Sequence, residues 1–353
     1  MDLSKLRQKI DVIDQKIVGI LNERAKVSLA IGHAKREGRK GIYVPARERQ
    51  VLERVHSLNK GPMPEGAFDS IYREIMSSSL ALEKPLRISY LGAEGSNSYS
   101  AARKKFGSQV ECVGVSSIAE VFQRVEHDDC DYGVVPIENS VEGAVTPTAD
   151  MLADSDLLVC AQVTVKITHN LMAACSIDKI TKVYSNPQVL GQCRTWLLAH
   201  MPPQKVAEVP VASTTDAAKI AATEKGAAAI ASLECASIYG LKALKTNIQD
   251  IAHNSTRFFV VGRQDAQPTG NDRTSIVFSI KDRPGVLYAM LAPFAKNKIN
   301  LTKIESRPIK KKAWDYYFFV DLIGHRDDKK VKKALEQLEG MCKFLKVLGS
   351  YPA

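Results

Sequence analysis

The first 84 residues place apolar side chains at helical spacing. The repeating positions, three or four residues apart with one gap, are Leu6, Ile10, Ile13, Ile17, Ile20, Val27, Ile31 and Ala34. No proline interrupts residues 1–44, so this period predicts one helix of about 35 residues, and a helix of that length usually lies against a partner. Pro45 and the turn-rich stretch 61–66 separate two further predicted helices, 46–59 and 66–83.

From Leu86 to Gly262 the pattern changes to short apolar runs that alternate with helical stretches. The predicted strands are 86–91, 132–137, 157–167, 182–185, 205–210, 227–231 and 257–262. Helices are predicted near 99–106, near 117–125, after Pro187 and over 214–224. This alternation is typical of α/β layering.

The last part of the chain follows a polar, turn-rich stretch, 264–273, that is typical of a linker. Strands predicted at 274–281, 300–308, 315–324 and 344–351 and helices at 285–296 and 327–343 follow the order βαββαβ. That order is the ferredoxin-like arrangement. The pattern therefore predicts a multidomain chain, with an all-α domain over 1–84, an α/β domain over 86–263 and a ferredoxin-like domain over 274–353.

Composition agrees with several globular domains and excludes other classes. The 353 residues correspond to two or three domains of ~150 residues, and 45% hydrophobic with 25% charged residues is ordinary for globular proteins. No apolar run approaches the ~18–20 residues of a membrane span, and the charged N-terminus lacks the apolar core of a signal peptide. The seven cysteines form no CxxC pair, which argues against a zinc site and a disulfide framework and favours free thiols in a reducing cytoplasm.

The net charge of +10 is compatible with two kinds of anionic partner, nucleic acid or small metabolites. Aromatic residues make up only 7%, and the one tight basic cluster, Lys310–Lys312, is short. We therefore expect an enzyme for anionic metabolites, without a nucleic-acid or membrane partner.

Arg24 occupies the gap in the apolar repeat of the first helix. A buried guanidinium is costly unless it meets an anion, which is either an internal carboxylate or a ligand. Lys35 follows eleven residues later and lies on the same face about 16 Å away, while Arg47 and Glu48 open the next predicted helix. Arg7 is about 26 Å from Arg24 along the helix, so it can join the same small site only from an antiparallel partner chain.

This segment resembles the all-helical chorismate mutase family. The matching stretches are LRQKID…D (6–14), NER (22–24), GHAK (32–35), ARE (46–48) and REIMSSSLALE (73–83). The resemblance implies an intertwined helical dimer in which Arg24, Arg47 and Arg7 of the second chain bind the substrate carboxylates. It also implies that Lys35 donates to the ether oxygen and that Glu48 and Ser79 hold the ring hydroxyl region. The rearrangement needs no nucleophile, only a fixed compact conformer and stabilisation of charge on the breaking ether oxygen.

Two positions depart from that family. Val44 stands where many members have an acid, and Glu83 stands where the family often has glutamine. A carboxylate would repel the ether oxygen, so Glu83 must carry a proton to donate; alternatively, it is a solvated residue at the helix end. The first possibility predicts that mutase activity falls as Glu83 loses its proton and that Glu83→Gln flattens the pH profile.

Polar residues collect at strand ends and helix starts in the α/β segment. Asn139 and Ser140 follow a strand, Gln188 and the pair Ser213–Thr214 open helices, and Thr256–Arg257 enters the last strand. Taken singly, each is explained by capping or turn chemistry, and His169 by a structural role. The loop 90–102 is not a GxGxxG fingerprint, so a dinucleotide fold is disfavoured.

Together these stretches, above all VPIENSVEGAV (135–145) and NSTRF (254–258), resemble prephenate dehydratase. The resemblance covers 86–263 and implies two α/β lobes with a cleft, like periplasmic binding proteins. It implies loss of the ring hydroxyl and a carboxylate, with Thr256 as donor to that hydroxyl and Arg257 as carboxylate anchor or a strut beside it. The substrate would be oriented by Asn139, Ser140, Gln188, Ser213 and Thr214. Asn186 stands where the family often has histidine, which argues against a histidine acid there.

Residues 274–353 resemble an ACT domain. In the related dehydratases this domain binds phenylalanine between paired copies at two motifs, which here are Gly285-Val286-Leu287 and Glu305-Ser306-Arg307-Pro308. The first motif is often Gly-Ala-Leu. The resemblance predicts feedback inhibition by phenylalanine; the alternative is an ACT domain that only dimerises.

The three resemblances in this order match a bifunctional chorismate mutase/prephenate dehydratase of phenylalanine biosynthesis, cytoplasmic, homodimeric or homotetrameric, and without a metal or cofactor. One alternative is a dehydratase whose helical segment is only a dimerisation arm. Another is a two-lobed ligand-binding protein with a regulatory module, which would not need the Thr256–Arg257 motif. A mutase fused to prephenate dehydrogenase would need a nicotinamide fingerprint that the sequence does not contain.

Overall fold

The computed structural model describes residues 2–37, 43–281, 283–309 and 316–353, so the basic cluster Lys310–Lys312 lies outside the described residues. The chain forms two compact units. The first contains the residues up to Arg87 together with Lys105–Glu111, and the second contains Ile88–Lys104 and Cys112–Ala353. None of the described helices is long and apolar enough to cross a membrane.

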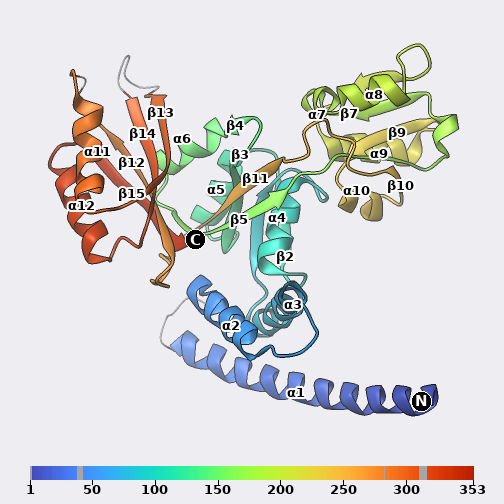
Figure 1. Ribbon diagram of the computed structural model, residues 1–353, viewed down its shortest axis with the longest axis horizontal. Coiled ribbons are helices and arrows are strands. Elements are labelled where there is room, and N and C mark those ends of the chain that lie inside the picture. Colours follow the sequence, from blue (N-terminus) through green and yellow to red (C-terminus); the bar gives the residue numbers. More distant parts are fainter. Residues whose placement is uncertain (1, 38–42, 282, 310–315) are drawn as a thin grey trace. The chain divides into compact units, whose positions relative to one another are not determined.

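Three helices make up most of the first unit: α1 (Leu3–Glu37), α2 (Pro45–Leu58) and α3 (Glu65–Glu83). They confirm the predicted single long helix and the two shorter ones (Figure 1). Both α1 and α2 pack against α3. Much of the apolar stripe of α1 is nevertheless uncovered, with Ile13 54% and Ile20 63% exposed.

The second unit begins with a mixed sheet in the order β2-β1-β3-β11-β5, with β4 (Gly143–Ala144) paired to β3. Its other strands are β1 (Arg87–Leu91), β2 (Glu111–Val115), β3 (Tyr132–Asn139), β5 (Leu158–Lys166) and β11 (Ser255–Gly262). The helices of this lobe are α4 (Asn97–Phe106), α5 (Ile118–Glu126) and α6 (Thr146–Asp154). Strands β1 and β3 run parallel, while β11 runs antiparallel to both β3 and β5. Strand β2 was not predicted.

A second lobe is inserted between β5 and β11, with a sheet in the order β10-β6-β9-β7-β8. Its strands are β6 (Asn170–Ala173), β7 (Lys182–Ser185), β8 (Ala207–Pro210), β9 (Ala227–Ala231) and β10 (Lys242–Lys245). Its helices are η1 (Ile177–Lys179), α7 (Pro187–Gln192), α8 (Arg194–His200), α9 (Thr214–Thr223) and α10 (Leu233–Ile238). The predicted strands β7 and β9 are confirmed, whereas β6 and β10 are four-residue strands that were missed.

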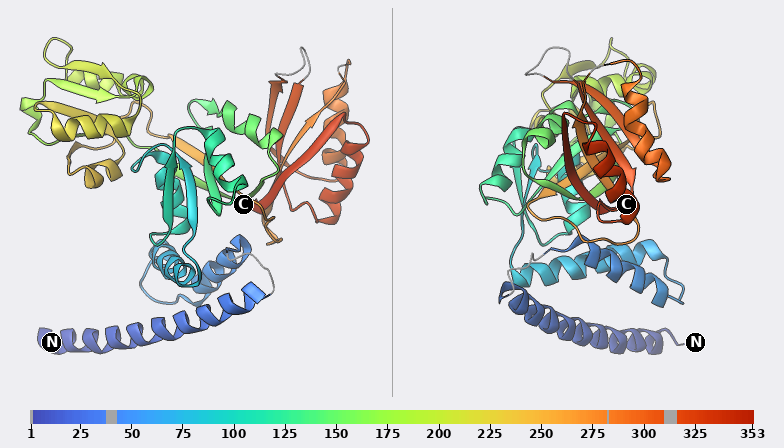
Figure 2. Two further views of the ribbon diagram at one scale, coloured as in Figure 1. Left: turned by 180° about the vertical axis from the view of Figure 1, so that it is seen from behind. Right: turned by 90° about the vertical axis from the view of Figure 1, so that its left-hand side faces the viewer.

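The C-terminal part has the predicted βαββαβ order, with an antiparallel sheet β13-β14-β12-β15. Its elements are β12 (Asp272–Ser279), α11 (Val286–Lys296), β13 (Leu301–Pro308), β14 (Tyr316–Ile323), α12 (Lys329–Glu339) and β15 (Phe344–Pro352). Both helices pack on one face of the sheet (Figure 2). Helix α12 ends earlier than predicted, at Glu339, directly before Gly340.

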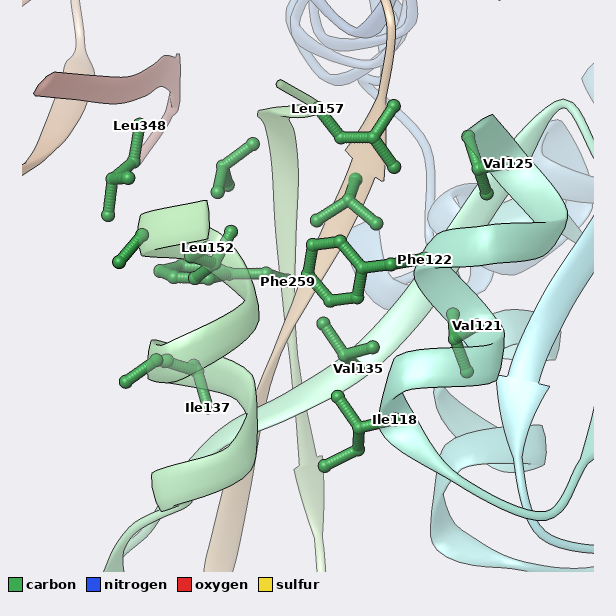
Figure 3. Packing of buried hydrophobic residues seen from close by; sticks show 14 of the residues in the cluster. Ile118, Val121, Phe122, Val125, Val135, Ile137, Leu152, Leu157, Phe259 and Leu348 are labelled. Atoms are coloured by element: carbon green, nitrogen blue, oxygen red, sulfur yellow. The ribbon is translucent and has the colours of Figure 1, made fainter. Parts of the chain in front are cut away.

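The other face of this C-terminal sheet shares a core with the first lobe. Phe122 of α5 points toward Val135 and Phe259 of the lobe's central strands, and Leu348 of β15 belongs to the same buried cluster (Figure 3). Gly349 has a φ of +151° and lies against the backbone of Val159 in β5, so its lack of a side chain permits this close approach. The dehydratase-like lobe and the ACT-like sheet are therefore joined by continuous apolar packing.

Candidate active sites

A cavity of about 360 Å³ lies in the helical unit. The sequence-predicted residues that line it are Arg24, Arg47, Glu48, Ser79 and Glu83. They come from all three helices, which shows why a short motif on one helix could not define the site. Val44 also lines the cavity, where a related mutase would often place an acid.

Arg24 reaches into this cavity and donates from Nη1 to Ser79 Oγ at 2.7 Å. Ser79 in turn donates to the carbonyl of Ile75, one turn earlier in α3. Among the described residues, the side-chain partner of the guanidinium is thus a hydroxyl, not a carboxylate. The internal salt bridge considered as the alternative is absent among those residues, and the charge remains available to an anion.

Glu48 is held by two donors on one oxygen. The Tyr43 hydroxyl donates to Glu48 Oε2 at 2.7 Å, and Lys105 Nζ lies 2.9 Å from the same atom. Lys105 comes from the end of α4, 57 residues further along the chain. Charge-assisted hydrogen bonds of this kind fix the orientation of a carboxylate.

Glu83 packs directly against Gly32 of α1. A Cβ at Gly32 would lie 2.6 Å from Glu83 Cγ and 2.9 Å from Oε2. Glu83 Oε2 is buried and has no hydrogen-bond partner among the described residues. This geometry disfavours a solvated helix-end residue and leaves a polar atom unsatisfied beside the cavity.

Two predicted mutase residues are not assembled with the others. Arg7 is exposed near the start of α1, away from this cavity, and Lys35 lies in the last turns of α1, where its side chain falls outside the described structure. Sequence reasoning did not identify Arg73, Tyr43 and Lys105 among the lining residues. Arg73 opens the motif 73–83 that was recognised, whereas nothing in the local sequence connects Lys105 with the helical segment.

In the first α/β lobe, Asn139 and Thr256 are brought together by strand pairing. They are direct partners in the antiparallel pairing of β3 with β11. Asn139 Nδ2 donates to Thr256 Oγ1 at 2.8 Å and to Asn254 Oδ1 at 2.7 Å. Because Thr256 Oγ1 accepts from the amide, and no acceptor for its own proton occurs among the described residues, the hydroxyl can donate to a ligand.

Gln192, which the sequence did not single out, connects the two lobes. Its Nε2 donates to Glu142 Oε1 at 2.7 Å, while its Oε1 lies 2.7 Å from His169 Nε2. The amides of Gln188 and Gln192 lower the pKa of Glu142. Burial lowers the pKa of His169, which fits the structural role expected for that ring.

Several predicted residues of this site already have local partners. Ser213 caps α9, accepting from the Asp216 N–H at 3.0 Å, and Ser140 Oγ accepts from the Ser255 N–H at the same distance. Thr214 is the first residue of α9, and Gln188 lies in the first turn of α7, where its N–H is capped by Asn186. Asn186 and Ser213 therefore do cap helices, as the simpler explanation held. The capped helices α7 and α9 begin just after the carboxyl ends of the parallel strands β7 and β8.

Arg257 faces away from Thr256, as neighbours on a strand must. Its Nη2 lies 2.5 Å from Asp321 Oδ2 and 3.2 Å from the Tyr351 hydroxyl, both in the ACT-like domain. Asp321 also accepts from Ser275 at 2.5 Å. Of the two roles expected for Arg257, these contacts favour the strut over the carboxylate anchor.

The two predicted effector motifs differ in where their side chains lie. Glu305 pairs with Lys303 at 3.3 Å, and Arg307 pairs with Asp150 of α6 at 3.2 Å and donates to the Thr146 carbonyl. These two alternate residues of β13 face the dehydratase-like lobe, whereas Ser306 and Pro308 are exposed on the other face. In the first motif, Gly285 has a φ of +77° at the start of α11, and Val286 and Leu287 form its first turn.

Three known families match successive parts of the chain. Family models match chorismate mutase type II over residues 6–84, prephenate dehydratase over 88–266 and the ACT domain over 274–340. The bifunctional chorismate mutase/prephenate dehydratase of Aquifex aeolicus is 47% identical and covers 99% of this chain and 98% of its own. The corresponding Pseudomonas aeruginosa protein is 43% identical, covering 99% and 97%.

Among solved structures, prephenate dehydratase from Arthrobacter aurescens in complex with L-Phe is similar, with a TM-score of 0.70 and 32% identity over 76% of this chain and 90% of that one. The fold and the matching families thus define a two-enzyme polypeptide with an ACT domain. The chain belongs to the family of bifunctional chorismate mutase/prephenate dehydratases.

Its function follows from that membership. It rearranges chorismate to prephenate and converts prephenate to phenylpyruvate with loss of water and carbon dioxide, two steps of phenylalanine biosynthesis. The alternatives of a dehydratase with an inactive helical arm, a ligand-binding protein and a dehydrogenase fusion are thereby set aside.

Proposed function

We propose that the cavity of the helical unit is the mutase site and that its residues have the roles predicted above. Arg24 and Arg47 bind substrate carboxylates, joined by Arg7 of a second chain, and Ser79 and Glu48 hold the ring hydroxyl region. The convergence of these side chains on one cavity from three helices supports this proposal.

The mutase mechanism is positioning together with electrostatic stabilisation. Arginine forks hold two carboxylates in fixed geometry, so the substrate stays in its compact conformer. Negative charge that develops on the ether oxygen is met by Lys35 and by the carboxyl group of Glu83. The buried Oε2 of Glu83, which has no hydrogen-bond partner in the described part of the chain, supports a role that is completed only by substrate.

We propose that Thr256 donates the proton to the departing ring hydroxyl of prephenate. The hydroxyl leaves as water, the ring carboxylate leaves as carbon dioxide, and its bonding electrons complete the aromatic ring. The Asn139 amide supports this role, because it donates to Thr256 Oγ1. The hydroxyl proton of Thr256 is then left to donate to substrate. Ser140, Gln188, Ser213 and Thr214 bound the same substrate site.

We propose that phenylalanine binds at the two ACT motifs and inhibits the enzyme. A continuous chain of ion pairs supports the coupling: Lys303 contacts both Glu305 of the effector motif, at 3.3 Å, and Glu138, at 3.6 Å. Glu138 also lies 3.7 Å from Arg257. Glu138 and Arg257 are the sequence neighbours of Asn139 and Thr256, so a shift of β13 reaches the proposed catalytic pair through two contacts.

We propose that the protein is a cytoplasmic homodimer or homotetramer with domains at 1–84, 86–263 and 274–353. The uncovered apolar stripe of α1 supports pairing of chains. The seven free cysteines support a reducing compartment.

One assay tests these proposals together. Purified protein is mixed with chorismate, and chorismate loss, prephenate and phenylpyruvate are followed with and without phenylalanine. Phenylpyruvate formation that phenylalanine suppresses is the expected result. Phenylpyruvate formation that is insensitive to phenylalanine would refute the effector proposal, and sedimentation of the active sample as a monomer would refute the assembly.

A further inference from the structure

We infer that Lys105 is a positioning residue of the mutase site, supplied by a helix that starts in the dehydratase segment. Its ammonium lies 2.9 Å from Glu48 Oε2, and the two side chains are only 19% and 14% exposed. Both residues line the mutase cavity. The inference rests on the proposed role of Glu48 at the ring hydroxyl.

The segment that carries Lys105 is fixed against α3. Gly107 has a φ of +78°, and a Cβ there would lie 2.5 Å from Ser77 Cβ, so the chain passes α3 at a distance that only glycine permits. The Ser108 N–H donates to Glu74 Oε2 and the Gln109 N–H to Ser77 Oγ, both at 3.1 Å. These contacts of residues 107–109 with α3 hold the backbone next to Lys105 at the cavity.

Aromatic packing completes the same wall. The rings of Tyr43 and Phe106 lie 5.0 Å apart, and Lys105 Nζ is 5.9 Å from the Tyr43 ring centroid. Tyr43 also donates to the Glu48 oxygen that Lys105 contacts. One carboxylate oxygen therefore has two fixed donors, which restricts how Glu48 can turn.

This arrangement has a chemical purpose in the proposed site. A carboxylate that accepts a hydrogen bond from substrate must be correctly aimed, and the adjacent ammonium holds it in place. Full mutase activity of this chain consequently requires residues beyond the helical segment.

The test uses the full chain with Lys105→Met, which keeps the apolar stem but removes the charge. We expect kcat/KM for chorismate to fall about ten-fold, and Lys105→Arg to restore most of it. Conversion of added prephenate should remain at the wild-type rate. Lys104→Met is the matched control, because Lys104 donates to the Thr164 carbonyl and does not line the cavity.

A double-mutant cycle separates positioning from a structural effect. In a Glu48→Gln background, Lys105→Met should cause no further loss, because its target is already gone. An equal loss in both backgrounds, wild-type mutase activity in Lys105→Met, or a fall of both enzyme activities with the melting temperature would overturn the inference. Wild-type activity of Glu48→Gln would show instead that the proposed role of Glu48 is wrong.

Discussion

Gly32→Ala is expected to inactivate the mutase through Glu83 alone. The added Cβ would lie 2.6, 2.8 and 2.9 Å from three atoms of the Glu83 side chain, whereas ordinary contacts are 3.4–4 Å. Glu83 must therefore move by roughly 1 Å, and a displacement of that size in a positioned group can cost about 100-fold in rate. We expect a loss of this order in the mutase kcat, with the dehydratase rate unchanged.

The assay measures chorismate loss and phenylpyruvate formation from added prephenate in the same preparation. Gly66→Ala in α3 is the control, because a Cβ there meets nothing within 4 Å. That variant should keep full mutase activity and gain roughly 0.5–1 kcal/mol of helix stability.

Wild-type mutase activity in Gly32→Ala would refute the argument that Glu83 is a catalytic group held by this contact. A loss caused by general misfolding would appear in both activities. Combining Gly32→Ala with Glu83→Ala removes the clash. The melting temperature should then recover, because the added methyl occupies the space of the missing carboxyl. The mutase rate should stay low, because the Glu83 carboxyl is gone.

The remaining predictions concern both enzymes and the contact between domains. Glu83→Gln should retain mutase activity, because the amide can donate a hydrogen bond to the ether oxygen; an inactive glutamine variant would contradict a donor role for Glu83. Thr256→Val should reduce phenylpyruvate formation by roughly 10²–10⁴-fold while mutase activity persists, and Thr256→Ser should retain activity; an active valine variant would exclude Thr256 as donor. Arg257→Met should lower the free energy of unfolding in urea by about 3–5 kcal/mol, because it leaves Asp321, 5% exposed, buried without its cation; a loss below about 1 kcal/mol would contradict the strut. The pKa of His169 is lowered by burial from 6.5, so the folded state binds fewer protons than the unfolded state. Stability should therefore decline as pH falls below that value, and the decline should be weaker in His169→Gln.

Local patterns in the sequence determined most of the secondary structure. The apolar residues of α1 recur every three or four positions because they share one face of the helix. This repeat predicted the length of the helix and showed that Arg24 lies on the apolar face. Short elements such as β6 and β10 were missed because four residues carry too little periodicity.

Resemblance of ordered motifs added the chemistry, and the structure brought several of those residues together. Arg24 contacts Ser79 and Asn139 contacts Thr256, two pairs that the motifs placed in common sites without stating the contacts. Strand alternation also decides that Thr256 and Arg257 face opposite ways, which a sequence could have indicated.

Only the tertiary structure shows which residues far apart in the sequence contact one another. Lys105 on Glu48, Gln192 on Glu142, and Asp321 on Arg257 join residues that are 57, 50 and 64 positions apart. No local period or cap encodes such a pair, because it depends on how whole helices and sheets pack. The sequence thus determined the elements and the reactions of this protein, whereas the packing decided which side chains support each reacting group.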